Sequence, residues 1–202
     1  APHDGFSIAD IDAITGPAIG RPKSATFRTM DLAGVDILAH VVSNLAGSLS
    51  EEDRRVFALP PVVNDMVTRG WVGSKSGQGF YKKDASGEIL TLEPSSMTYG
   101  AGAPVRLPSL DAAKAIEDPG ARIKVLFGGK DKVGQFLRAT LAPTLLYAAR
   151  VAPEVAYSID DVDRAMQWGF GWELGPFETW DALAAGFAPG FVGDDHRLVS
   201  WG

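Results

Sequence analysis

The sequence contains no cysteine, only 3 histidines and no run of about 20 apolar residues. Without cysteine the chain can form neither disulfides nor thiolate metal sites, and we expect a cytoplasmic location. Without a long apolar run, no segment is expected to span a membrane. The net charge is -6, and Lys and Arg do not cluster as a nucleic-acid surface would require. These absences leave an ordinary globular protein of 202 residues, long enough for one large domain or two small ones.

The sequence also lacks the Gly-x-Gly-x-x-Gly pattern that follows the first strand of a Rossmann dinucleotide site. The nearest candidates, Gly77-Gln78-Gly79 and Gly169-Phe170-Gly171, have no third glycine. Aspartates gather in two places, at residues 10–12 and 160–163. Their spacing lacks the glycine and the terminal glutamate of a calcium loop. We therefore expect these aspartates to cap helices rather than to bind metal.

What the sequence does contain is an internal repeat. Residues 7–12, Ser-Ile-Ala-Asp-Ile-Asp, return at 158–163 as Ser-Ile-Asp-Asp-Val-Asp. Residues 27–31, Phe-Arg-Thr-Met-Asp, return at 177–181 as Phe-Glu-Thr-Trp-Asp. The offsets are 151 and 150 residues, so one gap separates the copies. A serine followed three residues later by a carboxylate is typical of a helix start. We therefore predict two copies of one helical module.

The spacing of apolar residues predicts an all-α fold with one short β-hairpin. In the first copy, apolar residues at intervals of three and four predict a long helix over 26–48. A second helix is expected over 62–69, after two prolines, and the hairpin over 79–92. Residues 93–108 are rich in Pro, Gly and Ser, which indicates a connector.

Past the connector the helical period returns. Ser109 and Asp118 are expected to start helices, and a long helix is expected over 132–151, kinked at Pro143. From Gly186 on, no period can be read. The predicted division is a first module at 1–92, the connector at 93–108, and a second, degenerate copy of the module at 109–202.

Three segments resemble the C-terminal domain of the 3-hydroxyacyl-CoA dehydrogenases of fatty-acid β-oxidation. They are residues 16–36, which hold the turn Gly-Pro-Ala-Ile-Gly-Arg-Pro-Lys-Ser, residues 73–81, Gly-Ser-Lys-Ser-Gly-Gln-Gly-Phe-Tyr, and residues 174–181, Leu-Gly-Pro-Phe-Glu-Thr-Trp-Asp. The Lys-Ser-Gly-x-Gly-Phe-Tyr ending is the most specific of the three. Two tandem copies are similar to the long multifunctional bacterial β-oxidation proteins. The resemblance implies modules with a fold like the C-terminal domain of 6-phosphogluconate dehydrogenase.

In that family the complete enzyme has an N-terminal Rossmann domain, which holds NAD and the catalytic His–Glu pair. The chain begins at Ala1 without a methionine, and the resemblance implies a fragment that lacks this domain. Its parent would oxidise a 3-hydroxyacyl-CoA to a 3-ketoacyl-CoA with NAD as the acceptor. The partners implied are the acyl-CoA substrate and the parent's own Rossmann domain. We expect the chain to carry no catalytic residue and to be inactive by itself.

The resemblance implies a cofactor contact at Lys75. In the family, the lysine that opens this glycine motif reaches back to the NAD on the Rossmann domain. A cation on a glycine-bounded loop can approach a pyrophosphate without steric obstruction, so the role is chemically reasonable. The alternative is a solvated surface lysine that closes a turn.

The turn after the first short helix is implied to line the acyl-CoA site. Arg21 and Lys23 would meet CoA phosphates, and Phe27 would flank the acyl chain. The complete predicted set is Arg21, Pro22, Lys23, Ser24 and Phe27. The alternative is a basic helix start with Phe27 in the core, which its repeat partner Phe177 favours. The two cations are not matched in the second copy, where Glu173 occupies similar ground.

The remaining candidates have simpler explanations. Asp31 and its repeat partner Asp181 are predicted to be structural, because a carboxylate early in a helix accepts backbone N–H groups and suits the helix dipole. His40 follows Asp36 by four residues, so a His–carboxylate pair is geometrically possible. No nucleophile accompanies it, and we expect a surface or packing role. The tryptophans near the second copy, including Trp172, are expected to be core or interface residues.

Two other functions stay open. The first is a non-catalytic oligomerisation module, in which the second copy takes the place of a homodimer partner and makes an internal pseudo-dimer. A homodimer of the chain is possible as well. The second is the helical domain of another oxidoreductase, similar to 6-phosphogluconate dehydrogenase, against which the motif at 75–81 argues.

Overall fold

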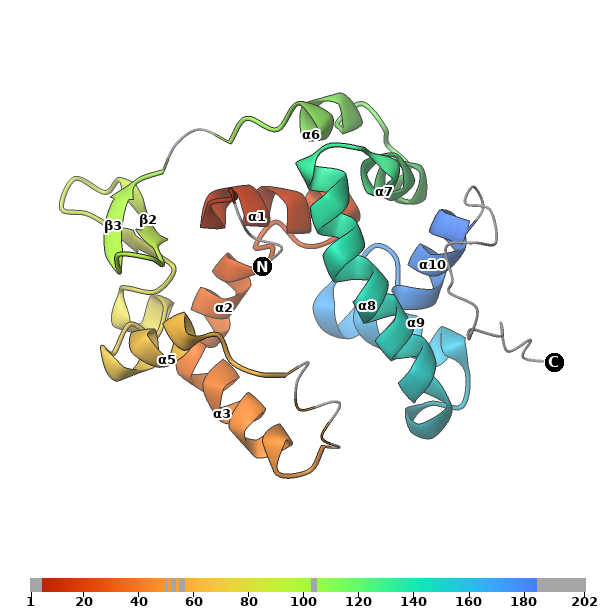
Figure 1. Cartoon of the computed structure of the whole chain (residues 1–202), viewed down its shortest axis with the longest axis horizontal. Helices are drawn as coiled ribbons and strands as arrows, with labels where there is room; N and C mark the ends of the chain where they lie inside the picture. Colours follow the sequence, from red (N-terminus) through yellow and green to blue (C-terminus); the bar gives the residue numbers. More distant parts are fainter. Residues whose placement is uncertain (1–4, 50, 52–53, 55–56, 103–104, 185–202) are drawn as a thin grey trace. The chain divides into compact units, whose positions relative to one another are not determined.

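The computed structural model describes residues 5–49, 51, 54, 57–102 and 105–184 (Figure 1). The segment from Gly186 on, in which we could read no period, lies outside the described residues. The chain divides into two compact units. The N-terminal unit comprises His3–Pro17 and Lys23–Arg106, and the C-terminal unit comprises Ala18–Pro22 and Leu107–Gly202, with Ala1–Pro2. The short segment Ala18–Pro22 therefore belongs to the C-terminal unit, although it lies inside the first copy of the repeat.

In the N-terminal unit, helices come first along the chain and a small sheet follows. The helices are α1 (Ile8–Thr15), α2 (Phe27–Ala33), α3 (Val35–Ala46) and α5 (Pro61–Thr68). The strands are β1 (Tyr81–Lys83), β2 (Ile89–Glu93) and β3 (Thr98–Ala101). The predicted mainly helical fold with a short hairpin is confirmed. None of the helices within the described part of the chain combines the length and the apolar character needed to cross a membrane.

The single long helix predicted over 26–48 is wrong, because the chain forms two helices there. Gly34 separates α2 from α3 with φ of +105°, a conformation that favours glycine. A Cβ atom at this position would lie 2.8 Å from Asp36 Oδ1. The apolar spacing did not reveal this break, because Leu32 and Val35 are three residues apart and fit one apolar stripe. In the structure Val35 is fully buried, whereas Leu32 is 70% exposed.

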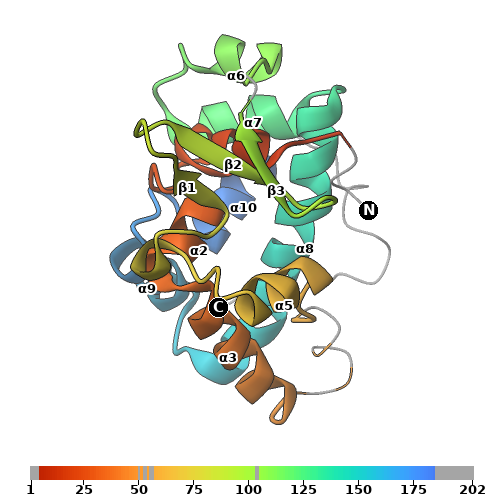
Figure 2. The same ribbon diagram turned by 90° about the vertical axis from the view of Figure 1, so that its left-hand side faces the viewer.

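The predicted hairpin is confirmed, and a third strand extends it (Figure 2). β1 pairs antiparallel with β2, with Tyr81 opposite Thr91, and β2 pairs antiparallel with β3, with Leu92 opposite Tyr99. β3 falls inside residues 93–108, which we expected to be a connector. Its sequence, Thr-Tyr-Gly-Ala, carries one aromatic residue, and the pairing with β2 rather than apolar alternation defines it.

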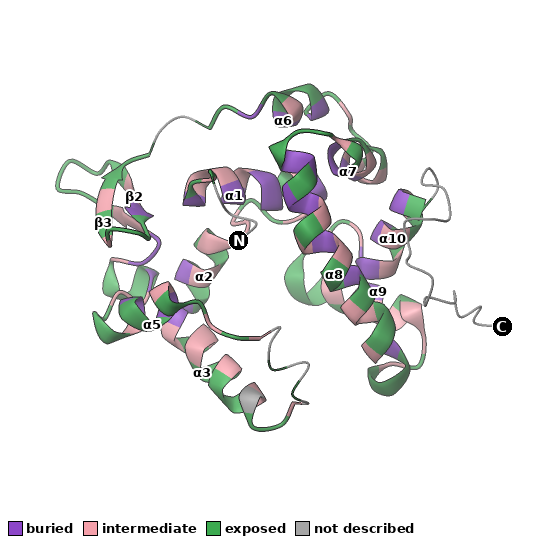
Figure 3. Cartoon of the chain, in the orientation of Figure 1, coloured by how far each residue is buried: buried purple, intermediate pink, exposed green. Residues whose placement is uncertain are grey.

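The core of the N-terminal unit joins helices and sheet. Buried side chains come from α1, α3, α5, the loop before β1, and β2, and they are Ile8, Val35, Val63, Met66, Phe80 and Leu92. Phe27 at the start of α2 packs on Phe80, with ring centroids 4.6 Å apart. Figure 3 shows the buried positions along these helices. The loop that ends at Phe80 is thus anchored in the core.

Helices are the only regular secondary structure among the described residues of the C-terminal unit. Its helices are α6 (Pro108–Ala113), α7 (Pro119–Gly128), α8 (Lys132–Val155), α9 (Ile159–Phe170) and α10 (Pro176–Ala184). Asp118 caps α7 as predicted, and α8 runs on past the predicted end at Val151. α10 contacts α7, α8 and α9. The core side chains include Ile123, Leu126 and Phe127 of α7 and Val133, Leu137 and Leu141 of α8.

Candidate functional site

The repeated aspartates hold each module together. Asp12 of α1 accepts hydrogen bonds from the backbone N–H groups of Thr26, Phe27 and Arg28, at 3.1, 2.7 and 3.3 Å. Asp163 of α9 does the same at the start of α10, where Phe177 N–H and Glu178 N–H donate at 2.8 and 3.0 Å. Both carboxylates satisfy orphan N–H groups at the start of a helix. The capping role predicted for these aspartates is confirmed, although each caps the following helix rather than its own.

A second clamp, centred on Asp31, holds the glycine loop (residues 73–81). The Asp31 carboxylate accepts hydrogen bonds from Phe80 N–H at 2.8 Å and from Tyr81 N–H at 2.9 Å. The predicted mechanism for Asp31 is therefore wrong, since it binds the backbone of a loop 49 and 50 residues away rather than the start of its own helix. Its repeat partner Asp181 is exposed.

Two glycines of the loop are required by this clamp. A Cβ atom on Gly79 would lie 2.6 Å from Asp31 Cγ, and a Cβ atom on Gly73 would lie 2.8 Å from Asp31 Cα. Real Cβ atoms do not approach other atoms this closely, so only glycine fits at either position. The spacing of glycines in the loop thus follows from the close passage of α2.

Tyr81 joins the two clamps. Its hydroxyl donates a hydrogen bond of 2.8 Å to Asp12 Oδ2, and its backbone N–H donates to Asp31. Burial raises the pKa of Asp12 and of Asp31, while the backbone N–H groups that they accept oppose the rise. Burial and the neighbouring Asp12 also raise the pKa of Tyr81. Arg28 lies over the Tyr81 ring, 4.7 Å from its centroid, and the sequence predicted no role for this cation.

Lys75 lies on the outer turn of the glycine loop. Its Nζ pairs with Asp36 Oδ2 at 2.6 Å, and the two side chains are 51% and 36% exposed. Asp36 belongs to the first turn of α3, where a carboxylate also suits the helix dipole. The hydrogen bond from Lys75 lowers the pKa of Asp36. His40, the possible partner that the sequence offered for Asp36, is exposed.

Replacing Lys75 by methionine is expected to raise the pKa of Asp36 toward its ordinary value of 3.8, because the ammonium hydrogen bond is the largest cause of the depression. A carboxyl whose pKa is depressed by folding stabilises the fold above its unfolded pKa and loses that effect as the pH falls through its folded pKa. The difference in melting temperature between the parent chain and K75M should therefore shrink as the pH falls below 3.8. NMR titration of the Asp36 carboxyl measures the shift. Lys114→Met, which removes the exposed pair with Asp111, should leave the Asp36 pKa unchanged, and an unshifted Asp36 in K75M would contradict the prediction.

The five predicted substrate residues are divided between the two units. Lys23, Ser24 and Phe27 belong to the N-terminal unit, and Arg21 and Pro22 belong to the C-terminal unit. Lys23 is exposed, whereas Ser24 Oγ accepts a hydrogen bond of 2.8 Å from Thr29 Oγ1. Phe27 is half-buried against Phe80, which agrees with the packing alternative. Ala25, between them, has φ of +49°, an uncommon conformation for a residue other than glycine.

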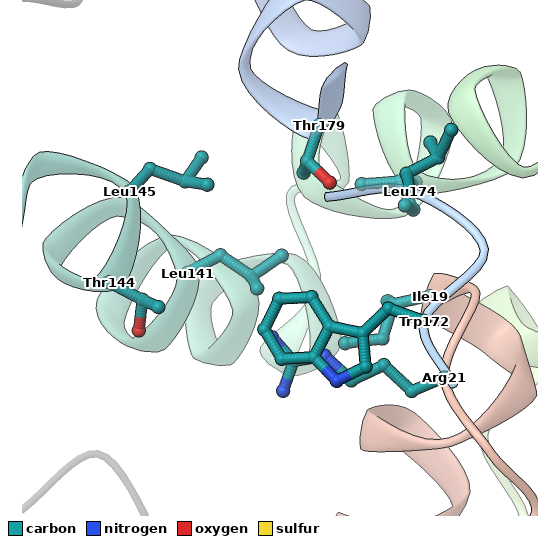
Figure 4. Close-up of a pocket in the computed structure, with 9 residues that line it drawn as sticks. Ile19, Arg21, Leu141, Thr144, Leu145, Trp172, Leu174 and Thr179 are labelled. Carbon is teal, nitrogen blue, oxygen red and sulfur yellow. The ribbon is translucent and has the colours of Figure 1, made fainter. Parts of the chain in front are cut away.

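Arg21 borders a hollow in the C-terminal unit (Figure 4). Its guanidinium lies over the indole ring of Trp172, 4.0 Å from the centroid. The hollow is small, with a cavity volume of about 10 Å³, and apart from Arg21 and Trp172 it is lined by Ile19, Ile123, Leu141, Thr144, Leu145, Leu174 and Thr179. Burial lowers the pKa of Arg21 to about 10, so the side chain remains a cation at neutral pH. Trp172 was expected to pack in a core or interface, and its contact with a cation was not predicted.

Comparison with known proteins identifies relatives of this chain. The family model for the 3-hydroxyacyl-CoA dehydrogenase, C-terminal domain, matches residues 2–83 and 134–191, which include both copies of the repeat and the glycine loop. A protein of Bacillus subtilis strain 168 named "Probable 3-hydroxyacyl-CoA dehydrogenase" is 47% identical over 89% of this chain and 23% of its own length. A protein of Rickettsia prowazekii named "Putative fatty acid oxidation complex trifunctional enzyme" is 25% identical over 86% of this chain and 23% of its own.

The chain thus spans about a quarter of the length of these two relatives. The matched family model covers more than half of the chain, and it includes both clamp aspartates, the glycines that they require and Lys75. The chain belongs to the family of 3-hydroxyacyl-CoA dehydrogenase C-terminal domains.

Proposed function

We propose that this chain forms the substrate-side wall of an NAD-dependent 3-hydroxyacyl-CoA dehydrogenase of fatty-acid oxidation. In the complete enzyme a 3-hydroxyacyl-CoA becomes a 3-ketoacyl-CoA, and NAD accepts the hydride. The observation that carries the proposal is the rigid presentation of Lys75. Two buried carboxylates and two obligatory glycines fix the loop that bears it, and precise placement of a binding cation is what such a rigid support provides.

The described residues do not form a complete NAD site. Their strands make one antiparallel sheet, whereas a dinucleotide site of the Rossmann type needs a parallel βαβ unit. Lys75 fits a more limited role at the edge of a cofactor. Its ammonium is half-exposed and held in place by Asp36, so it offers one charged hydrogen bond to a phosphate or ribose oxygen that another domain brings to it. The rest of the NAD site belongs to that other domain.

The residues predicted to line the acyl-CoA site have different proposed roles. Lys23 is exposed on the turn before α2 and is the proposed contact for a CoA phosphate. Ser24 and Phe27 shape the same turn, with Ser24 holding Thr29 and Phe27 anchoring the turn in the core. Arg21 and Pro22 continue the turn in the C-terminal unit, where Arg21 is stacked on Trp172. In this proposal the chain binds and orients the substrate but carries no catalytic acid or base.

A chimaera tests the proposal. The stretch of the Bacillus subtilis relative that aligns with this chain is replaced by residues of this chain, and NADH formation from 3-hydroxybutyryl-CoA is measured against the unaltered relative. We expect the chimaera to be active and the 202-residue chain alone to be inactive. In the chimaera, K75M should raise the KM for NAD about tenfold with little change in kcat, because one charged hydrogen bond to the cofactor is lost. Lys23→Met should instead raise the KM for the acyl-CoA.

The control is Lys114→Met, since Lys114 is an exposed lysine paired with Asp111 outside the predicted site. It should change neither KM. A folded but inactive chimaera, turnover by the chain alone, or equal effects of K75M on both substrates would each contradict the proposal.

The pseudo-dimer function is also supported by one observation. Arg21 and Trp172 occupy equivalent places in the two copies at the offset of 151, and they contact each other. Gly20 C=O accepts a hydrogen bond of 2.7 Å from Glu173 N–H, and Pro22 lies against Gly171, which is the reciprocal pair at the same offset. All of these contacts lie within the C-terminal unit, which includes Ala18–Pro22 of the first copy. This assembly role is compatible with the substrate-side role.

A further inference from the structure

Tyr99 of β3 contacts the chain on both sides of the turn that bears Lys75. Its ring packs on Trp71, which lies two residues before the glycine loop, with ring centroids 5.3 Å apart. Its hydroxyl donates a hydrogen bond to the backbone C=O of Gly79, near the end of the loop. The two contacts use different parts of one side chain, the apolar ring and the polar tip. Tyr99 therefore bridges the segments that enter and leave the turn.

Backbone pairing closes the base of this turn. Gly73 N–H donates to Gln78 C=O at 2.8 Å, and Gln78 N–H donates to Gly73 C=O at 3.2 Å. The Ser76 hydroxyl lies within hydrogen-bonding distance of both carbonyl groups, at 3.0 and 2.9 Å. Lys75 lies within the closed turn, so its position follows that of the base. A side chain that holds Gly79, directly after the base, therefore acts on the position of Lys75 through the backbone.

Tyr99 and Asp31 hold opposite groups of the same short stretch. Asp31 accepts hydrogen bonds from the N–H groups of Phe80 and Tyr81, whereas Tyr99 donates to the C=O group of Gly79. Asp31 belongs to α2 and Tyr99 to β3. The end of the glycine loop is thus fixed from two elements, and each of them satisfies backbone groups that the other leaves unpaired.

The surroundings of Tyr99 fix the direction of its hydroxyl. Tyr99 lies opposite Leu92, a core residue of β2, and Lys82 Nζ lies 4.2 Å from the centroid of its ring, which is a cation–π contact. Burial raises the pKa of Tyr99, although hydrogen bonding to the Gln78 side chain opposes the rise, so the hydroxyl remains a donor at neutral pH. Tyr99 lies between the stretches 2–83 and 134–191 that the family model matches, so membership of the family assigns it no role.

We propose that Tyr99 is a positioning residue for Lys75, which it holds through the base of the turn. The inference rests on the proposed function for what Lys75 contacts, but the positioning itself is a property of the chain alone. Loss of the Tyr99 hydroxyl leaves the C=O of Gly79 without this donor and loosens the loop, while the ring still packs on Trp71. The Lys75 ammonium is then placed less precisely at Asp36 and at the cofactor, which weakens a charged hydrogen bond without removing it.

Titration of the Asp36 carboxyl in the 202-residue chain tests the positioning without any cofactor. The hydrogen bond from Lys75 is the largest cause of the low pKa of Asp36, so a displaced ammonium raises that pKa. In Tyr99→Phe we expect the pKa, measured by NMR, to rise part of the way toward 3.8, by less than in K75M. Tyr157→Phe is the matched control, because Tyr157 is fully exposed, and it should leave the pKa unchanged. An unshifted Asp36 in Tyr99→Phe would overturn the proposal.

Kinetics of the chimaera connect the positioning to the cofactor. Tyr99→Phe should raise the KM for NAD about threefold to fivefold, with little change in kcat or in the KM for the acyl-CoA. Combined with K75M it should add no further increase, because both substitutions act through the same ammonium. Equal rises in both KM values, or full additivity with K75M, would mean a merely structural role and would overturn the proposal. If K75M itself left the KM for NAD unchanged, the proposed function would fail, and the Asp36 titration would still decide whether Tyr99 positions Lys75.

Discussion

Replacing Asp12 by alanine is expected to lower the free energy of unfolding of the N-terminal unit by about 3–4 kcal/mol. The substitution removes the acceptor for Thr26, Phe27 and Arg28 N–H at the start of α2 and for the hydroxyl of Tyr81. These donors lie in a half-buried region, so water replaces the lost acceptor only in part. Urea unfolding followed by circular dichroism measures the loss.

Two control variants separate this effect from a general loss of a carboxylate. Asp163→Ala removes the equivalent cap in the second copy, where two N–H groups donate, and it should cost about 2 kcal/mol. Asp65→Ala removes an exposed carboxylate of α5 and should change the stability by less than about 0.5 kcal/mol. Equal losses in Asp12→Ala and Asp65→Ala would contradict the proposed clamp.

The same carboxylate gives the clamp a pH dependence with a definite sign. Burial raises the pKa of Asp12 in the folded chain above its ordinary value of 3.8. A folded state that binds the proton more tightly than the unfolded state gains stability as the pH falls through its folded pKa, and the gain is complete below 3.8. Asp12→Asn lacks this gain. The stability difference between the parent chain and Asp12→Asn should therefore widen over this range of falling pH.

Gly79→Ala is expected to destabilise the N-terminal unit by about 3 kcal/mol or more. The new Cβ atom would lie 2.6 Å from Asp31 Cγ and 2.7 Å from Gly73 Cα, so the carboxylate and the loop have to separate. That separation breaks the hydrogen bonds from Phe80 and Tyr81 N–H to Asp31. Thermal and urea unfolding measure the loss, and in the proposed chimaera the KM for NAD should rise because Lys75 moves with the loop.

Gly77→Ala is the matched control within the same loop. A Cβ atom at Gly77 would meet nothing within 4 Å, and only its φ of +73° opposes the substitution, which costs about 1–2 kcal/mol. A double variant, Gly79→Ala with Asp31→Ala, removes the carboxylate with which the new methyl group clashes. The two effects should then be much less than additive, because both substitutions break the same clamp. Additive losses, or equal costs at Gly77 and Gly79, would contradict this explanation.

Local signals in the sequence were reliable where local forces decide the structure. The helix starts at Ser7 and Asp118 were predicted from capping chemistry, and the structure confirms both. The hairpin over 79–92 was also predicted, and Gly87 in its turn has φ of +89°. The prediction of one long helix over 26–48 was wrong. A single glycine inside a helical pattern is usually tolerated, so Gly34 did not predict a break. Only the backbone conformation at Gly34 shows that this one ends a helix.

By itself, then, the sequence determined the repeat, the helical class and the family, because each depends on the order of residues along the chain. The tertiary structure decided what individual side chains do. It turned Asp31 toward a loop about 50 residues away, gave Lys75 the partner Asp36, and placed Arg21 on Trp172. Each of these contacts joins residues that are far apart in the sequence. The conformational preferences of neighbouring residues therefore do not predict them. They form because folding satisfies buried N–H groups and charges with whatever acceptors packing brings near.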